Sequence, residues 1–329
     1  MFFKNNFKRI TISLLIIMIL SYSIGCFILL KSPNKVDIHN ILEEFNGLNV
    51  SIGNWGNFND SSNYNIDETQ THPMDNIESL DINLVSGNIN VIPYDGTDIK
   101  ATLKGSLKGN WGSDLPKLQL TSSNNTIFIK FERSNGLLNG INITSRLQLD
   151  VYIPNKFNGN TSIKGVSSDI KADNLNTKNL TINTVSGDTT ISNITTNAFK
   201  FNSISGKLLV ENLSSTSNEV KTTSGNMNLN SISGDLNFQS ISGDINSNYK
   251  SFDGNKVNGK LTSGKANIIL PNDSSFYVNC STTSGSLNID FPVTVNGSMK
   301  KSINGEVGNS SNKGKIEIST ISGNINIKK

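Results

Sequence analysis

Serine followed by glycine recurs along this chain and is the pairing that could do chemistry. A serine hydroxyl acts as a nucleophile when a histidine or another base activates it. A Ser-Gly-Asp loop, such as those in "SISGDLNFQSISGDIN", places carboxylate and carbonyl oxygens where calcium could bind. Each of these chemistries needs partner residues at a suitable spacing. The pairs end at Gly87, Gly187, Gly206, Gly225, Gly234, Gly243, Gly264, Gly285 and Gly323.

The partners of a nucleophile or of an acid-base pair are missing from the sequence. The only histidines, His39 and His72, stand in polar sequence without cysteine or carboxylate neighbours at metal-ligand spacing. Beyond residue 80 the carboxylates are scattered, and Arg133 and Arg146 are the only arginines. G-x-S-x-G and phosphate-binding loop motifs are also absent. The sequence therefore predicts no enzyme, no catalytic residues and no cofactor.

Calcium binding is also disfavoured by the sequence. Nonapeptide calcium rolls carry two further glycines and an aspartate in every repeat. Here the residue after the glycine varies and is lysine at Lys207 and Lys265, and nine-residue steps occur only around Gly234 and Gly243. We therefore predict no metal site and interpret the glycines as structural turns, with Asp188 facing Lys207 and Asp244 facing Lys265 at stacked corners.

Charge and cysteine content exclude two further classes of protein. The formal charge of +3 comes from interspersed lysines and carboxylates, with no basic run outside the first ten residues, so we expect no nucleic-acid partner. The two cysteines, Cys26 and Cys280, are far apart in the sequence and do not make a disulfide framework. Cys280 lies in a strand-like segment and is interpreted as a packed thiol.

The N-terminus has the pattern of a membrane anchor. Residues 1–9 carry Lys4, Lys8 and Arg9, and the run from Ile10 to Leu30 is uncharged and closed by Lys31. As a helix these residues would extend ~31 Å, about the thickness of a bilayer core. The cationic tail favours a cytoplasmic N-terminus, which places the remainder outside the cell. The sequence therefore predicts a cytoplasmic tail over 1–9, a transmembrane signal-anchor helix over 10–31 and a single-pass membrane protein with an extracellular C-terminal domain.

Two other interpretations of this segment stay open. One is a cleaved signal peptide, although the apolar run is long for one and no A-x-A site follows it. The other is lipidation at Cys26 within "SIGC", although Ser23 stands where leucine is usual and the apolar run continues past the cysteine.

Residues 32–76 are predicted to form a polar stalk or cap, and residues 77–329 are predicted to form the repeat domain.

The repeat has a period of about 19 residues. From Ser168, where "VSSDI" resembles a copy that has lost its glycine, the intervals are 19, 19, 19, 9, 9, 21, 21 and 38 residues. Apolar residues keep constant offsets from each glycine: two and four residues after it, as at Leu236 and Phe238, and two and five residues before it, as at Val185 and Ile182. Alternation with period two indicates strands with one buried face.

We therefore predict an all-β fold, a β-solenoid built from rungs of about 19 residues with two strands each. Single rungs cannot bury their apolar rows, but stacked rungs can. About 12 rungs at the usual strand spacing would give a body ~60 Å long. Ser-Gly at both corners of a rung would explain the nine-residue steps. The last strand ends in Lys328 and Lys329, which would protect an open sheet edge.

Several segments resemble a bacterial family of β-strand-repeat proteins. These are "IESLDINLVSGNINVIPYDGTDIKATLKG" (77–105), "SRLQLDVYIPNKFNGNTSIKGVSSDIKADNL" (145–175) and the following SGD, SGN and SGK turns. The family is a domain of unknown function, common in Gram-positive envelopes, and is called an adhesin by analogy with other surface β-solenoids. The resemblance implies an envelope location and a binding or scaffolding role, and it supplies no active site to carry over.

The predicted function is thus a membrane-anchored, non-catalytic cell-surface protein that acts in adhesion and binding or as an envelope scaffold. The alternatives are an envelope-stress sensor or regulatory module and, less favoured, a polysaccharide-acting β-helix enzyme. The expected partner is a cell-wall glycan or a surface protein, and the oligomeric state stays open. The candidate binding aromatics are Trp55 and Trp111, the latter in the insertion "GSLKGNWGSDLPK", together with Phe157 and Tyr249.

Overall fold

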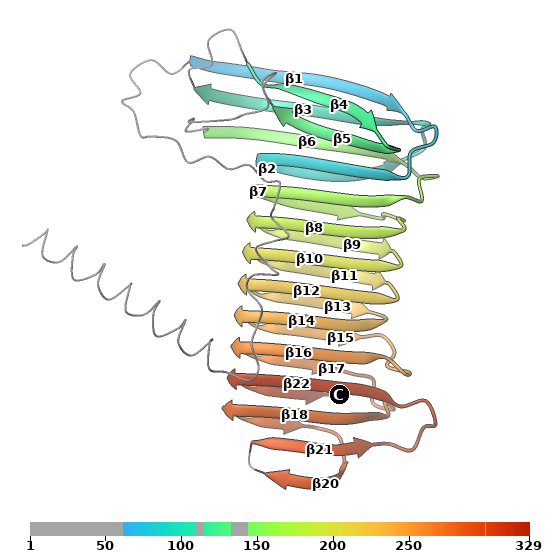
Figure 1. Cartoon of the computed structure of the whole chain (residues 1–329), viewed down its shortest axis with the longest axis vertical. Helices are drawn as coiled ribbons and strands as arrows, with labels where there is room; N and C mark the ends of the chain where they lie inside the picture. Colours follow the sequence, from blue (N-terminus) through green and yellow to red (C-terminus); the bar gives the residue numbers. More distant parts are fainter. Residues whose placement is uncertain (1–61, 110–114, 133–143, 300) are drawn as a thin grey trace, which may run out of the picture.

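The chain forms an elongated, all-β slab in which short strands stack along one axis (Figure 1). A computed structural model describes residues 62–109, 115–132, 144–299 and 301–329. The predicted tail and transmembrane segment, Cys26, Trp55 and Trp111 lie outside these ranges. Within the ranges, no helix is long and apolar enough to cross a membrane.

Two rows of strands, here called the front and back sheets, face each other across the core. β2 (Ser79–Tyr94) and β7 (Asn160–Asp173) bend and belong to both rows, so the pairing is continuous. In spatial order the front sheet also contains β4 (Lys117–Ser123) and β5 (Thr126–Glu132) before β2 and β7, and after them β8 (Asn179–Ser186), β10 (Ala198–Ser205), β12 (Ser217–Ser224), β14 (Asp235–Ser242), β16 (Lys256–Ser263), β22 (Gly314–Ser322), β18 (Phe276–Ser284), β21 (Ser302–Val307) and β20 (Val293–Met299).

The back sheet begins with antiparallel strands and continues with parallel ones. Its first three strands are β1 (Ser62–Pro73), β3 (Asp98–Gly109) and β6 (Thr144–Pro154). β1 lies in the segment predicted as a stalk or cap and extends the sheet. After β2 and β7 come β9 (Thr189–Thr195), β11 (Leu208–Ser214), β13 (Met227–Ile232), β15 (Ile245–Tyr249), β17 (Ala266–Ile269), β23 (Ile325–Lys328) and β19 (Leu287–Ile289).

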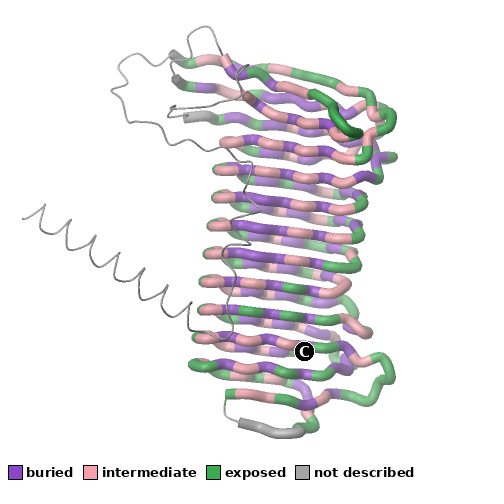
Figure 2. Tube along the Cα trace, in the orientation of Figure 1, coloured by how far each residue is buried: buried purple, intermediate pink, exposed green. Residues whose placement is uncertain are grey.

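The core lies between the two sheets and consists of stacked apolar columns, visible as the buried segments of Figure 2. The residues two after each glycine stack in register across the back sheet, as Leu208, Met227, Ile245 and Ala266 do. All four are buried, and so are Leu236 and Phe238 on the front sheet. The predicted offsets of two and four residues after the glycine are therefore confirmed as inward positions.

The prediction that the residue two positions before each glycine faces the core is wrong in the front sheet. Val185, Ile204 and Ile241 are half-exposed, whereas the preceding hydroxyl residues, such as Thr184 and Ser203, are buried. The reason is parity, because a residue five positions before the glycine faces inward and one two positions before it must then face outward. Ile232 is buried because its glycine, Gly234, lies at the opposite corner.

The C-terminal rung is inserted between two earlier rungs. β22 pairs with both β16 and β18, and β23 pairs with both β17 and β19. The prediction that Lys328 and Lys329 protect an open edge is therefore wrong, because β23 has neighbours on both sides. After β16 and β17 the chain leaves one rung position empty and forms β18 and β19 below it. It then turns back through the hairpin β20–β21, and β22 and β23 fill the empty position.

Cys280 is a packed thiol, as the sequence predicts. The side chain is buried on β18, and burial raises the pKa of the thiol to about 12. The neutral form is favoured because a thiolate would lose its hydration there.

Candidate functional site

The Ser-Gly corners form a shallow groove of about 660 Å³ along one side of the slab. The glycines of successive rungs stack in the spatial order Gly187, Gly206, Gly225, Gly243, Gly264, Gly323 and Gly285. A Cβ atom on Gly206 would lie 2.2 Å from the carbonyl oxygen of Gly187, and the same short approach recurs along the column. Glycine is required because two backbones pass closer than any side chain permits.

The two remaining predicted turn glycines lie elsewhere. Gly87 is at the upper end of the same corner, where a Cβ atom would lie 2.4 Å from the carbonyl oxygen of Leu147. Gly234 is at the opposite corner and has a φ of 82°, which glycine adopts readily.

The polar residues after these glycines hold neighbouring rungs together. Oδ1 of Asp188 accepts a hydrogen bond of 3.0 Å from the backbone N–H of Lys207, and Oδ1 of Asp244 accepts one of 2.9 Å from that of Lys265. Asp188 and Asp244 therefore contact the lysines predicted for them, through hydrogen bonds from the backbone N–H groups of those lysines. Within the described ranges, no group of three or more histidine, cysteine, aspartate or glutamate side chains could hold a metal ion. The hydrogen bonds of Asp188 and Asp244 and the close glycine contacts join successive rungs at this corner.

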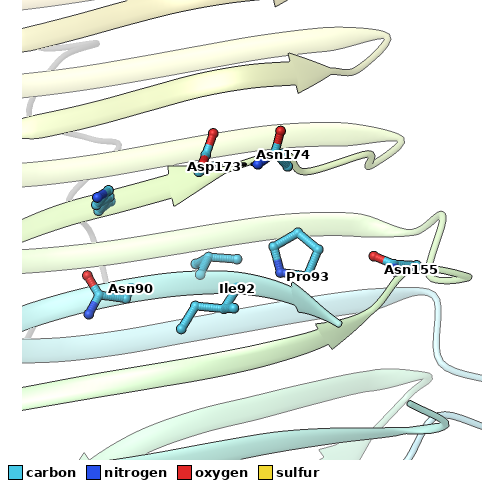
Figure 3. A pocket seen from close by; sticks show the side chains of 8 residues that line it. Asn90, Ile92, Pro93, Asn155, Asp173 and Asn174 are labelled. Atoms are coloured by element: carbon cyan, nitrogen blue, oxygen red, sulfur yellow. Dashed lines mark hydrogen bonds between the residues drawn. The ribbon is translucent and has the colours of Figure 1, made fainter. Parts of the chain in front are cut away.

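A second hollow of about 520 Å³ lies on the back sheet beside β2 and β7 (Figure 3). Its carboxylate, Asp173, accepts hydrogen bonds from Ser192 at 2.8 Å and Asn193 at 3.2 Å. Asn90 donates to Asp150 at 2.7 Å, and Asn155 donates to Asp95 at 2.6 Å. These polar groups are already engaged with the protein, which leaves few to recognise a ligand.

A third hollow, of about 530 Å³, lies on the outer surface of the front sheet over β14, β16, β22 and β18. Pairing between these strands arranges its side chains in two rows of four. Neighbours in a row are about 4.8 Å apart, and the rows are separated by about 6.6 Å, two residues along a strand. We call this surface the amide face: one row is Asn237, Asn258, Glu317 and Asn279, and the other is Gln239, Lys260, Ser319 and Ser281.

The amides of this surface have no partner among the described residues. Asn237, Gln239, Asn258 and Asn279 point outward and neither donate nor accept a side-chain hydrogen bond there. Each therefore presents one carbonyl oxygen and two N–H donors to solvent. The amide face itself carries one lysine, Lys260, and one glutamate, Glu317, and Glu317 pairs with Lys315 at 3.0 Å.

An exposed aromatic ring borders the amide face. Tyr277 precedes Asn279 by two residues on β18, so both side chains leave the sheet on the same side. It is 52% exposed, and Nζ of Lys313 lies 5.2 Å from the centre of its ring. A flat ring beside a regular array of amides can stack on an apolar ligand face while the amides bind hydroxyl groups.

A row of asparagines on the back sheet differs from the amide face in that its side chains bond to one another. Asn288, Asn326, Asn267 and Asn246 each donate a hydrogen bond of 2.6–2.8 Å to the next, ending at Asn228. This ladder uses its amides to hold five strands in register. The amide face has the same residue type in stacked positions but leaves those groups free.

The structure describes two of the four predicted binding aromatics, and both are buried. Trp55 and Trp111 lie outside the described residues, and Phe157 and Tyr249 are each only 3% exposed. The interpretation of Phe157 and Tyr249 as surface candidates is wrong. Both fill core space, and Tyr249 packs edge-on against Phe252 at 5.0 Å between ring centres.

Comparison with known proteins supports the architecture. Residues 77–328 match the family described as Toastrack DUF4097, the same part of the chain that carries the resemblance inferred from the sequence. No curated protein matches the chain.

Similar solved structures include three bacterial proteins. A "putative adhesin" from Bacteroides fragilis shares 18% identity and a TM-score of 0.46, over 80% of this chain and 97% of that one. One from Parabacteroides merdae shares 13% and 0.39, over 80% and 96%. A "putative cell adhesion protein" from Clostridium sporogenes shares 15% and 0.33, over 80% and 99%. Similarity this low carries no argument about function.

Proposed function

The chain belongs to the Toastrack DUF4097 family, and from its amide face we propose that it is a non-catalytic binding module for a neutral glycan. The observation that carries the proposal is the array of unpartnered amides beside the exposed ring of Tyr277.

The chemistry of the amide face favours a polyhydroxylated ligand. Amides and hydroxyls both donate and accept hydrogen bonds, as sugar hydroxyls do. Only two of the eight side chains of this face are charged, one lysine and one glutamate, which does not favour a strongly acidic or basic ligand. The rows repeat at strand spacing, so a polymer with repeated hydroxyl groups could contact several of them at once.

Removing two amides is expected to weaken glycan binding about tenfold. Each hydrogen bond contributes about 0.5–1.5 kcal/mol, and 1.4 kcal/mol corresponds to a factor of ten. The double variant Asn237→Ala and Asn258→Ala, and separately Tyr277→Ala, should lose affinity for purified cell-wall glycan fragments in titration calorimetry.

A matched control exists on the back sheet. Asn230 and Asn248 are also exposed, and the double variant Asn230→Ala and Asn248→Ala should bind as the parent protein does. Equal loss in both double variants, or no glycan binding by the parent, would refute the proposal. Capture of a specific envelope protein in place of a glycan would favour a scaffold or regulatory role.

We further propose that the sheet lies outside the cell and is anchored by residues 10–31. The uncharged run from Ile10 to Leu30 and the cationic residues before it support this arrangement. A membrane-impermeant amine reagent should label Lys260 and other exposed lysines in intact cells. Labelling that requires permeabilisation would contradict an external location. The mass of the N-terminal peptide would distinguish an intact anchor from cleavage or from lipidation at Cys26.

A further inference from the structure

The lower end of the slab is a step, because the front sheet continues two strands further than the back sheet. Beyond β18 the front sheet adds β21 and then β20 (Figure 1). β19, which follows β18 in the same rung, pairs only with β23 among the described residues and so ends the back sheet. The two extra strands therefore have no back strand opposite them.

The inner side of the step is apolar and only partly covered. Val293 on β20 and Ile303 on β21 pack against the core but are half-buried. Val295, two residues after Val293 and on the same side of the strand, is 50% exposed. On the back sheet, Leu287 and Ile289 of β19 are also half-exposed, whereas their equivalents in the rungs above are buried.

Neither edge strand at this end carries a charged residue or a proline. β20 reads VTVNGSM and β19 reads LNI, with no charged residue and no proline in either. Exposed edges of soluble proteins are usually protected by charge, proline, short strands or bulges, because unpaired N–H and C=O groups recruit other strands. Here β19 is only three residues long and β20 has a register shift between Val295 and Gly297, but neither strand has charge or proline. The lower end therefore lacks the charged and proline residues that most directly oppose strand pairing.

The upper end is protected in two ways. Its edge strands β1 and β4 contact each other: the backbone N–H of Leu118 donates to Oε2 of Glu68 at 2.7 Å, and Nε2 of His72 lies 2.9 Å from Oγ of Ser122. β1 also carries the charges of Asp67 and Glu68. End-to-end pairing there would separate these contacts or bury a charge.

We propose that the lower end binds a second copy of this chain, related by a two-fold axis parallel to the strands. Each copy has two empty strand positions in its back sheet, opposite its own β21 and β20. In this arrangement β20 and β21 of the other copy fill those positions. β20 of each copy extends the back sheet of the other at β19, and the apolar inner faces pack together. The same patch serves on both copies, so the assembly closes as a dimer.

Strand directions agree with this arrangement. β21 is antiparallel to both β18 and β20, so β20 runs in the same direction as β18. β19 follows β18 through the Gly285 corner and runs the opposite way. Rotation about an axis parallel to the strands leaves directions unchanged, so β20 meets β19 of the second copy as an antiparallel neighbour, the pairing that is slightly more stable.

Light scattering coupled to size-exclusion chromatography tests the proposal on the full chain in detergent solution. The parent protein should have the mass of a dimer at micromolar concentration. Val295→Lys places a charge in the joint, and we expect it to raise the dissociation constant at least about tenfold, toward monomer. Asn237→Lys, on the outer surface away from the step, should remain dimeric.

Two outcomes would overturn the inference. One is a monomeric parent protein across the concentration series, and the other is a Val295→Lys variant that stays dimeric with a native circular dichroism spectrum. If the lysine variant unfolds, Val295→Thr is the substitute, because threonine has nearly the same shape and the site is half-exposed. Its dissociation constant should rise several-fold while the monomer's melting temperature is unchanged. An unaltered dissociation constant would overturn the proposed interface.

Discussion

Phe238→Asp is expected to unfold the middle of the slab. The Phe238 side chain is fully buried in register between Val220 and Gly259. Its ring occupies the space that Gly259 leaves free, since a Cβ atom on Gly259 would lie 2.2 Å from the ring. Loss of a buried phenylalanine alone costs about 3–5 kcal/mol, and an unpaired buried carboxylate costs more. Together these approach the whole stability of a typical domain.

Thermal unfolding followed by circular dichroism, together with protease resistance, measures this effect. The control is Asn237→Asp, one residue earlier in the same strand, whose side chain is exposed and which should melt within a few degrees of the parent protein. Because rungs contact only their neighbours, the damage should begin in the rungs around β14 and spread outward. A Phe238→Asp protein with unchanged melting and protease resistance would show that this side chain does not face the core.

Gly225→Val is the substitution with the next largest expected effect. A Cβ atom on Gly225 would lie 2.0 Å from the carbonyl oxygen of Gly206, which is part of the backbone of the next rung. Relief of the clash requires these two rungs to separate at the corner, which would break hydrogen bonds between them such as that from the backbone N–H of Leu208 to the carbonyl oxygen of Asn226, 3.0 Å long. We expect a loss of several kcal/mol, as for other strained backbone and overpacked sites.

Urea unfolding of Gly225→Val and Ser224→Ala separates the close approach from the neighbouring side chain. Ser224 is exposed in the same corner, so its alanine variant should keep the midpoint of the parent protein. A valine variant with the parent midpoint would mean that the corner has room for a side chain and that glycine serves another purpose there.

Local patterns in the sequence were sufficient to predict the strands, the corners and most of the core. Alternation is a property of a single strand, so Leu208 and Val210 could be placed inward without knowledge of their neighbours. The same reasoning failed for Val185 and Ile204, because two offsets that differ by three cannot share a face. Four residues with positive φ, Asn174, Asn193, Asn212 and Ser231, also recur every 19 residues, but the apolar alternation does not reveal their conformation.

The insertion of the last rung could be decided only by the tertiary structure. Gly323 stacks between Gly264 and Gly285, although it follows both in the sequence. Nothing local to "STISGNINIKK" specifies this, because every rung presents a similar edge, with the same spacing and the same apolar columns, to any incoming strand.

The candidate site depends on that insertion. Glu317 and Ser319 separate the amides of β16 from those of β18, so the amide face exists only because β22 lies between them. The step at the lower end likewise exists because β20 and β21 turn the chain back. The sequence by itself determined that this chain stacks short strands around aliphatic columns, since that information lies within each strand. Which strands become neighbours, and therefore which polar side chains share a surface, was decided by contacts between residues far apart in the chain.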